Sequence, residues 1–129
     1  MEIALRSALI AWLAADPALS AQLNAVTEEA PSRTALPWLA IAASASADWS
    51  AKDRAGREVR IALELHCRGD RPDSAATLVG AIESRIASLP SAQTGFQLVT
   101  ASFLRARAEQ RAANTRAILI EYRFRVLAE

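Results

Sequence analysis

The sequence predicts an α+β fold: an antiparallel sheet of about four or five strands with long hairpins, covered on one face by amphipathic helices. Residues 57–68 alternate apolar and polar side chains, a period of two that is typical of a half-buried strand. The same alternation returns at residues 116–127. Between these strands, residues 73–89 carry one apolar helical stripe. Hairpins on either side of one such helix favour a sheet with one covered face.

Size and composition indicate one globular domain, residues 1–129. The hydrophobic fraction is 52%, but only 5% of residues are aromatic, so we expect a core of leucine, isoleucine and valine. The net charge of +1 argues against a dedicated nucleic-acid binder, which would be strongly basic. Fourteen arginines accompany one lysine. Together with the alanine excess, this bias indicates a GC-rich genome rather than arginine-specific chemistry.

The N-terminal third is predicted to begin with two helices. Residues 2–14 place Leu5, Leu9, Trp12 and Leu13 on one helical stripe. Asp16 and Pro17 form an N-cap and first-turn pair, which predicts a short second helix that runs to Leu23. The N-terminal apolar run is short and interrupted by Arg6, so we expect neither a signal peptide nor a membrane anchor.

The first hairpin is predicted from residues 38–47 and 57–68, with a polar connection at 48–56. At about 3.3 Å per residue, the second of these strands spans roughly 36 Å, about twice the usual length. A strand of that length is typical of an arm or wall of an assembly.

The second half of the chain predicts a helix followed by another hairpin. Pro72 opens the helix and Pro90 stops it. Strands at 96–107 and 116–127 follow, joined by the polar residues 109–115. The last strand is predicted to turn Ile118, Ile120, Tyr122, Phe124 and Val126 toward the core.

The chain offers few groups for catalysis. Its only histidine, His66, adjoins its only cysteine, Cys67, but adjacent strand residues point to opposite faces and cannot form a dyad. His66 and Glu64 share a face, yet two ligands do not make a metal site. The four glycines are scattered singly, so no phosphate-binding loop is predicted. We therefore expect no enzyme, no catalytic residue, no cofactor and no metal.

Two groups of residues are candidates for contacts. The connection after the first strand surrounds a tryptophan with polar residues, and large aromatics contribute strongly at interfaces. The alternative is a tryptophan that folds back over its own sheet. The candidate interface comprises Asp48, Trp49, Ser50, Lys52 and Asp53. The candidate basic face comprises Arg105, Arg107, Arg123 and Arg125, which could lie near phosphate; the alternative is an ordinary solvated sheet face.

The charges are unevenly distributed along the chain. Residues 1–30 hold four carboxylates against Arg6, a net charge of −3. Residues 101–129 hold six arginines against three glutamates, a net charge of +3. An acidic part and a basic part on one subunit suit head-to-tail contacts, which generate rings when they close.

The whole chain resembles the tail terminator, or tail completion, proteins of siphovirus-type phages and phage-derived gene transfer agents, a family similar to the lambda tail terminator. The loop-and-strand segment around Trp49 is the most specific part of the resemblance. The matching features are Asp16-Pro17-Ala18-Leu19, Pro37-Trp38-Leu39, Asp48-Trp49-Ser50 with Lys52-Asp53, Gly56-Arg57-Glu58 before the long strand, the helix 73–89, and Arg123-Phe124-Arg125-Val126-Leu127 in the closing hairpin.

The resemblance implies a structural protein that forms a hexameric ring, caps the tail tube and joins it to the head connector. Its partners would be further copies of itself, the tail tube protein and the head–tail connector protein, with DNA passing through non-specifically. It would occupy the host cytoplasm during assembly and then the neck of a phage or gene transfer agent particle. The alternative is a freestanding ligand- or peptide-binding α+β domain, which would need a concave apolar pocket.

Overall fold

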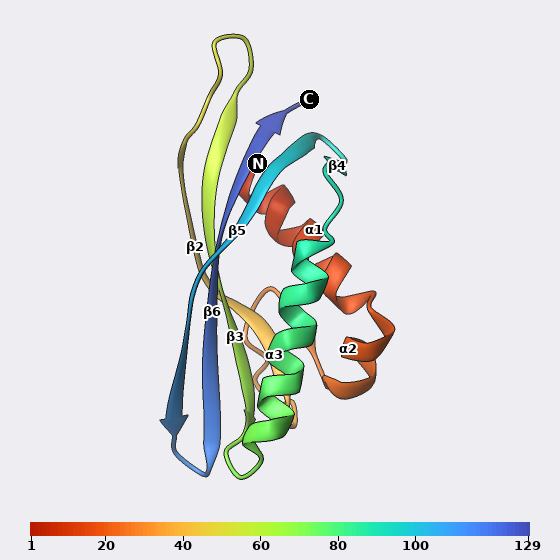
Figure 1. Cartoon of the computed structure of the whole chain (residues 1–129), viewed down its shortest axis with the longest axis vertical. Helices are drawn as coiled ribbons and strands as arrows, with labels where there is room; N and C mark the ends of the chain where they lie inside the picture. The colour runs from red at the N-terminus through yellow and green to blue at the C-terminus, as the bar shows by residue number, and fades with distance from the viewer.

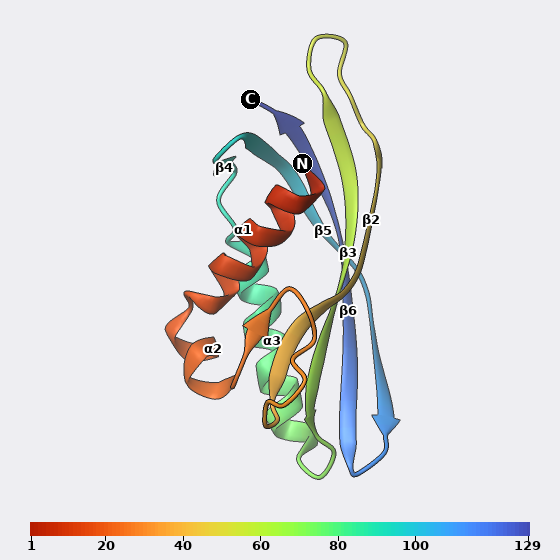
Figure 2. The ribbon, with the colours of Figure 1, turned by 180° about the vertical axis from the view of Figure 1, so that it is seen from behind.

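The computed structural model describes all residues from Met1 to Glu129. Three helices cover one face of a six-stranded sheet whose order is β1-β2-β3-β6-β5-β4 (Figures 1 and 2). The helices are α1 (Glu2–Ala14), α2 (Pro17–Gln22) and α3 (Pro72–Ala87). The strands are β1 (Val26–Thr27), β2 (Trp38–Asp48), β3 (Gly56–Arg68), β4 (Ala92–Gln93), β5 (Phe96–Arg111) and β6 (Thr115–Ala128).

The predicted α+β fold with one covered face is confirmed, and the sheet differs from the expectation in two respects. It has six strands rather than four or five, because the two-residue strands β1 and β4 lie along its edges. The sheet is also not wholly antiparallel, since β1 pairs with β2 in parallel. Two-residue strands carry no alternation, which is why the sequence pattern does not predict them.

The centre of the sheet is the long antiparallel pair β3 and β6. The two strands stay in register from Gly56 opposite Leu127 to Arg68 opposite Thr115. Ile61 lies opposite Tyr122, and Leu63 lies opposite Ile120. These side chains are buried under the helices, as the alternation predicts. The intervening polar side chains form the face that no helix covers.

The helices supply the other half of the core. α1 buries Leu5, Leu9 and Leu13, and α3 buries Ala75, Leu78, Ile82 and Ile86. The predicted cap of α2 is present: the Asp16 carboxylate accepts a hydrogen bond from the backbone N–H of Leu19 at 3.0 Å.

A reciprocal contact joins α1 to α3 at the edge of the core. The Trp12 indole donates a hydrogen bond to the Arg85 carbonyl at 2.8 Å, and the Arg85 guanidinium donates one to the Trp12 carbonyl at 2.8 Å. The guanidinium carbon lies 3.5 Å from the centroid of the indole ring, a cation–π contact. Trp12, predicted as part of the apolar stripe, therefore lies at the seam between two helices.

The last hairpin is longer than predicted. Residues 109–115 were expected to form the connection, but β5 continues to Arg111 and β6 resumes at Thr115. The turn places Ala113 and Asn114 in the left-handed region, with φ of 58° and 53°. Glu109 and Gln110 resemble a loop in sequence because the end of β5 has solvent on both faces, so no apolar alternation marks the strand.

The two long hairpins point in opposite directions, and the β2–β3 hairpin extends well beyond the helices (Figure 1). The β2–β3 connection lies at one end of the molecule, and the β5–β6 turn lies at the other. Neither terminus lies at the end that carries the β5–β6 turn. None of the three helices has the length and apolarity needed to cross a bilayer.

The assignment of residues to the core can be tested by truncating one buried residue of the helices and one of the sheet. Ile82 of α3 and Ile120 of β6 are both fully buried. We expect Ile82→Ala and Ile120→Ala each to lower the free energy of unfolding by roughly 2–5 kcal/mol, measured by denaturant titration. Ile3→Ala is the control, because Ile3 is 79% exposed and its loss leaves no cavity. Losses below about 1 kcal/mol at both buried sites would show that the core faces are wrongly assigned.

Candidate functional site

The five candidate interface residues lie together in the connection at the tip of the β2–β3 hairpin. Asp48, Ser50, Lys52 and Asp53 are exposed, whereas Trp49 is half-buried. The Ser50 hydroxyl donates a hydrogen bond to the Asp48 carboxylate at 2.6 Å. The tip thus presents polar side chains around one partly accessible indole.

The tip is held in place by contacts that the sequence did not indicate. The backbone N–H of Trp49 donates a hydrogen bond to the Gly56 carbonyl at 3.0 Å. A Cβ at Gly56 would lie 2.4 Å from the Trp49 carbonyl oxygen, so only glycine allows this approach. The Arg54 guanidinium donates hydrogen bonds at 2.6 and 2.9 Å to the Ala128 carbonyl. Arg54 therefore fastens the tip to the end of β6.

The Trp49 ring turns toward the helix-free face of its own sheet. The guanidinium carbon of Arg125 lies 5.4 Å from its centroid, within the range of a cation–π contact. Arg125 lies opposite Glu58, one of the outward residues of β3. Trp49 therefore follows in part the alternative arrangement, in which it folds back over the sheet, and it is not a core residue.

The four candidate basic residues also share one surface, the helix-free face of β5 and β6. Each of them has a glutamate partner: Arg105 pairs with Glu121 at 3.5 Å, Arg107 with Glu109 at 2.9 Å, and both Arg123 and Arg125 with Glu58, at 3.8 and 3.1 Å. Arg105 and Arg107 remain about two-thirds exposed. The surface is therefore a network of ion pairs rather than an uncompensated basic patch.

A second cluster lies on the same face beside β1. Trp38 and His66 stack with ring centroids 4.0 Å apart, and Nε2 of His66 contacts the Glu64 carboxylate. Cys67 lies on the opposite, covered face, where burial raises the pKa of its thiol. The predicted separation of His66 from Cys67 is therefore confirmed. The sequence did not predict the stack, because it depends on how β2 and β3 pair.

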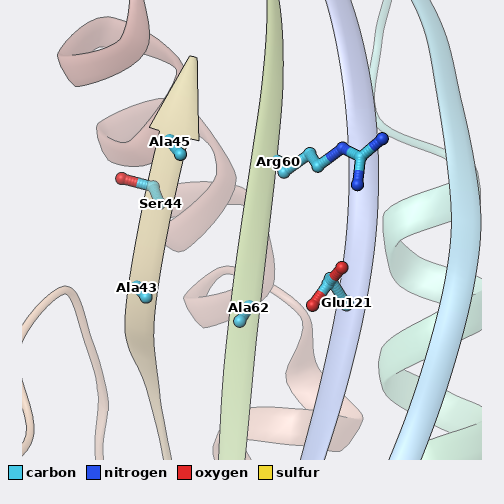
Figure 3. Close-up of a pocket in the computed structure, with 6 residues that line it drawn as sticks. All are labelled: Ala43, Ser44, Ala45, Arg60, Ala62 and Glu121. Atoms are coloured by element: carbon cyan, nitrogen blue, oxygen red, sulfur yellow. The ribbon is translucent and has the colours of Figure 1, made fainter.

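The hollows of the molecule are shallow. One of about 240 Å³ lies on the helix-free face, with alanines as its floor and Arg60 and Glu121 at one side (Figure 3). Arg60 lies opposite Arg123 and makes none of the ion pairs of this face. The largest hollow measures about 300 Å³. Ligand pockets are typically enclosed and of about 300–1,000 Å³, so the geometry does not favour the ligand-binding alternative. No group of three or more metal-ligating side chains is present.

Comparisons with known proteins identify the family of this chain and a structure that shares its fold. Residues 7–127 match the family described as tail completion protein gp17. The chain is also similar to a chain in the structure of the virion of a native gene transfer agent particle, with a TM-score of 0.82 and 24% sequence identity over 97% of this chain and 96% of that chain. This likeness shows a shared fold. No curated protein sequence matches the chain. On the match to residues 7–127, the chain belongs to the family of tail completion proteins.

Proposed function

We propose that this protein is the terminator subunit of a phage-like tail, which forms a hexameric ring, caps the tail tube and joins it to the head connector. The family match over residues 7–127 is the observation that carries the proposal. The fold shared with a chain of a gene transfer agent virion supports it. The role is structural, and no catalytic step belongs to it. The protein would act in the neck of the particle after assembly in the host cytoplasm.

The shape of the subunit supports a place in a ring. A sheet with one uncovered face and two projecting hairpins presents extended surfaces to neighbours instead of enclosing a ligand (Figures 1 and 2). We propose that the hairpin tip, with Asp48, Trp49, Ser50, Lys52 and Asp53, contacts a neighbouring subunit or the tail tube. Its attachment through Arg54 to the Ala128 carbonyl would preserve the position of that contact.

We further propose that the face carrying Arg105, Arg107, Arg123 and Arg125 lines the lumen through which DNA passes. A duplex must slide through such a ring, so strong binding of phosphates would hinder passage. The glutamate partner of each arginine weakens the attraction to phosphate. This network of ion pairs therefore fits a passive channel better than a DNA-binding site.

The ring can be tested directly on the purified protein. We expect analytical ultracentrifugation at low salt to give a mass of six subunits, and negative-stain microscopy to show six-fold rings of tail diameter. The oligomer should become smaller as salt rises, because salt screens the attraction between acidic and basic surfaces. A strict monomer at every salt and protein concentration would contradict the ring.

The contribution of the hairpin tip can be separated from folding. We expect Trp49→Ala to fold, with a slightly lower unfolding temperature because the contact with Arg125 is lost, but to fail to assemble into tails, counted by electron microscopy of particle-producing cells. Trp49→Phe is the matched control, because it retains a large apolar ring and should preserve most assembly. If Trp49→Ala instead fails to fold, Trp49 contributes to the stability of its own subunit, and the proposed contact is overturned.

The passive channel predicts weak, sequence-independent DNA binding. In a titration of labelled duplex, binding at about 50 mM salt should be weak, because arginines paired with glutamates neutralise few phosphates. It should fall below detection at about 150 mM, because added salt opposes the counterion release that drives binding. Unrelated duplex sequences should bind equally. Nanomolar binding that survives the higher salt would make the arginine face a genuine nucleic-acid site.

A further inference from the structure

Both edges of the sheet are almost uncovered. β1 pairs with β2 only at Leu39 and Ala40, and β4 pairs with β5 only at Phe96 and Gln97. No strand of the chain lies along the outer side of residues 41–48 or of residues 99–111. Unpaired edges present backbone N–H and C=O groups that can pair with a strand of another chain.

Part of each free edge lacks charge and proline, although other usual protections of an edge strand are present. A bulge interrupts β2 between Ile41 and Ala43, bulges interrupt β5 at Leu98/Thr100 and Phe103/Arg105, and β5 carries charges only from Arg105 onward. Residues 42–47 consist only of alanine and serine, with no proline and no charge to hinder pairing. The free stretch of β5 also lacks proline, and it contains Val99 and Phe103, which are 42% and 48% exposed. These are two of the three large hydrophobic residues that the chain exposes. Apolar surface of this kind is typical of the centre of a protein contact.

The free stretches of β2 and β5 lie at the same height along the sheet, and the two strands run in opposite directions. Ala45 pairs with Arg60, Arg60 with Arg123, and Arg123 with Ser102, so Ala45 and Ser102 lie on one row across the sheet. Three successive antiparallel pairings make β2 and β5 run in opposite directions. A rotation about an axis along the strands therefore brings β2 of one copy beside β5 of the next in antiparallel orientation.

The charges beside the two edges are complementary. Glu2 lies beside β2, because its carboxylate accepts a hydrogen bond from Ser44 at 2.6 Å. Hydrogen bonds from Ser44 and Ser46 hold the pKa of Glu2 below its usual value, so it is ionised at neutral pH. The carboxylates on the β2 side are Glu2, Glu28, Glu29 and Asp48, against Arg6, Arg57 and Arg60, which leaves an excess of negative charge. The β5 strand itself carries Arg105, Arg107 and Arg111 against Glu109.

We propose that the free edge of β2 on one subunit pairs with the free edge of β5 on the next copy of this chain, so that one antiparallel sheet continues around the ring. This inference rests on the proposed ring and adds the contact that closes it. The contact is heterologous, as a ring of more than two subunits requires. Val99 and Phe103 would be covered by the neighbour, and the acidic β2 side would face the basic β5 side.

Disulfide cross-linking tests the contact in the whole protein. In a Cys67→Ala background, Ser102→Cys is combined with Ala43→Cys, Ala45→Cys or Ala47→Cys, which sample three registers along one exposed row. Within one subunit these positions are separated by three strand spacings, roughly 14 Å, so an intrachain disulfide is excluded. We expect at least one pair to give a ladder of covalent oligomers, ending at the closed ring, after oxidation with copper–phenanthroline. Reducing agent should collapse the ladder.

Controls distinguish this contact from random collision and from failure of the ring itself. Ser102→Cys with Ala62→Cys is the matched control, because Ala62 lies on the same face but on the central strand β3, out of reach of a neighbour. Six-fold rings in the microscope without cross-linking in any of the three pairs would overturn the edge contact and leave the ring function standing. A protein that is monomeric under all conditions would overturn both.

Discussion

The apolar face shared by β3 and β6 is the constraint on which the rest of the structure depends. Each strand turns every second side chain toward the helices, and the register places apolar residues such as Leu63 and Ile120 opposite each other. A slip of one residue would turn the apolar side chains of a strand to the solvent, so the register is strongly specified. Because only one face is apolar, the three helices all cover that face.

This asymmetry determines which surfaces remain for other molecules. With all helices on one side, nothing in the chain covers the opposite face, and the short strands β1 and β4 cover only a small part of each edge. The ion pairs on the uncovered face contribute little to stability, since exposed pairs are typically worth about 0–1 kcal/mol. Their clearer effect is electrostatic: they hold several arginines on a face without making it strongly basic. This balance of charge is what the proposed channel requires, since a duplex must pass through it without being retained.

The sequence predicted the fold best where alternation was strong and worst where solvent lies on both sides of a strand. Strand β3 was placed within one residue because its apolar and polar residues contrast sharply. The sequence predicts a connection where β5 ends, because the polar residues there meet solvent on both faces of the strand. Among the candidate site residues, those around Trp49 necessarily lie together, because they belong to one short segment of the chain. The attachment of the tip through Arg54 was not predictable, since it joins residues 74 positions apart.

The sequence by itself determined which side chains face the core, where the main helices and strands run, and that the chain resembles tail completion proteins. These properties follow from local spacing and short motifs, which each segment carries independently of the others. Only the tertiary structure decided that Arg125 lies beside both Trp49 and Glu58, and that Arg85 binds Trp12. It also decided that β2 and β5 leave most of their outer sides unpaired. Those relations depend on strand order and on the register between distant segments, and no local pattern of residues specifies either.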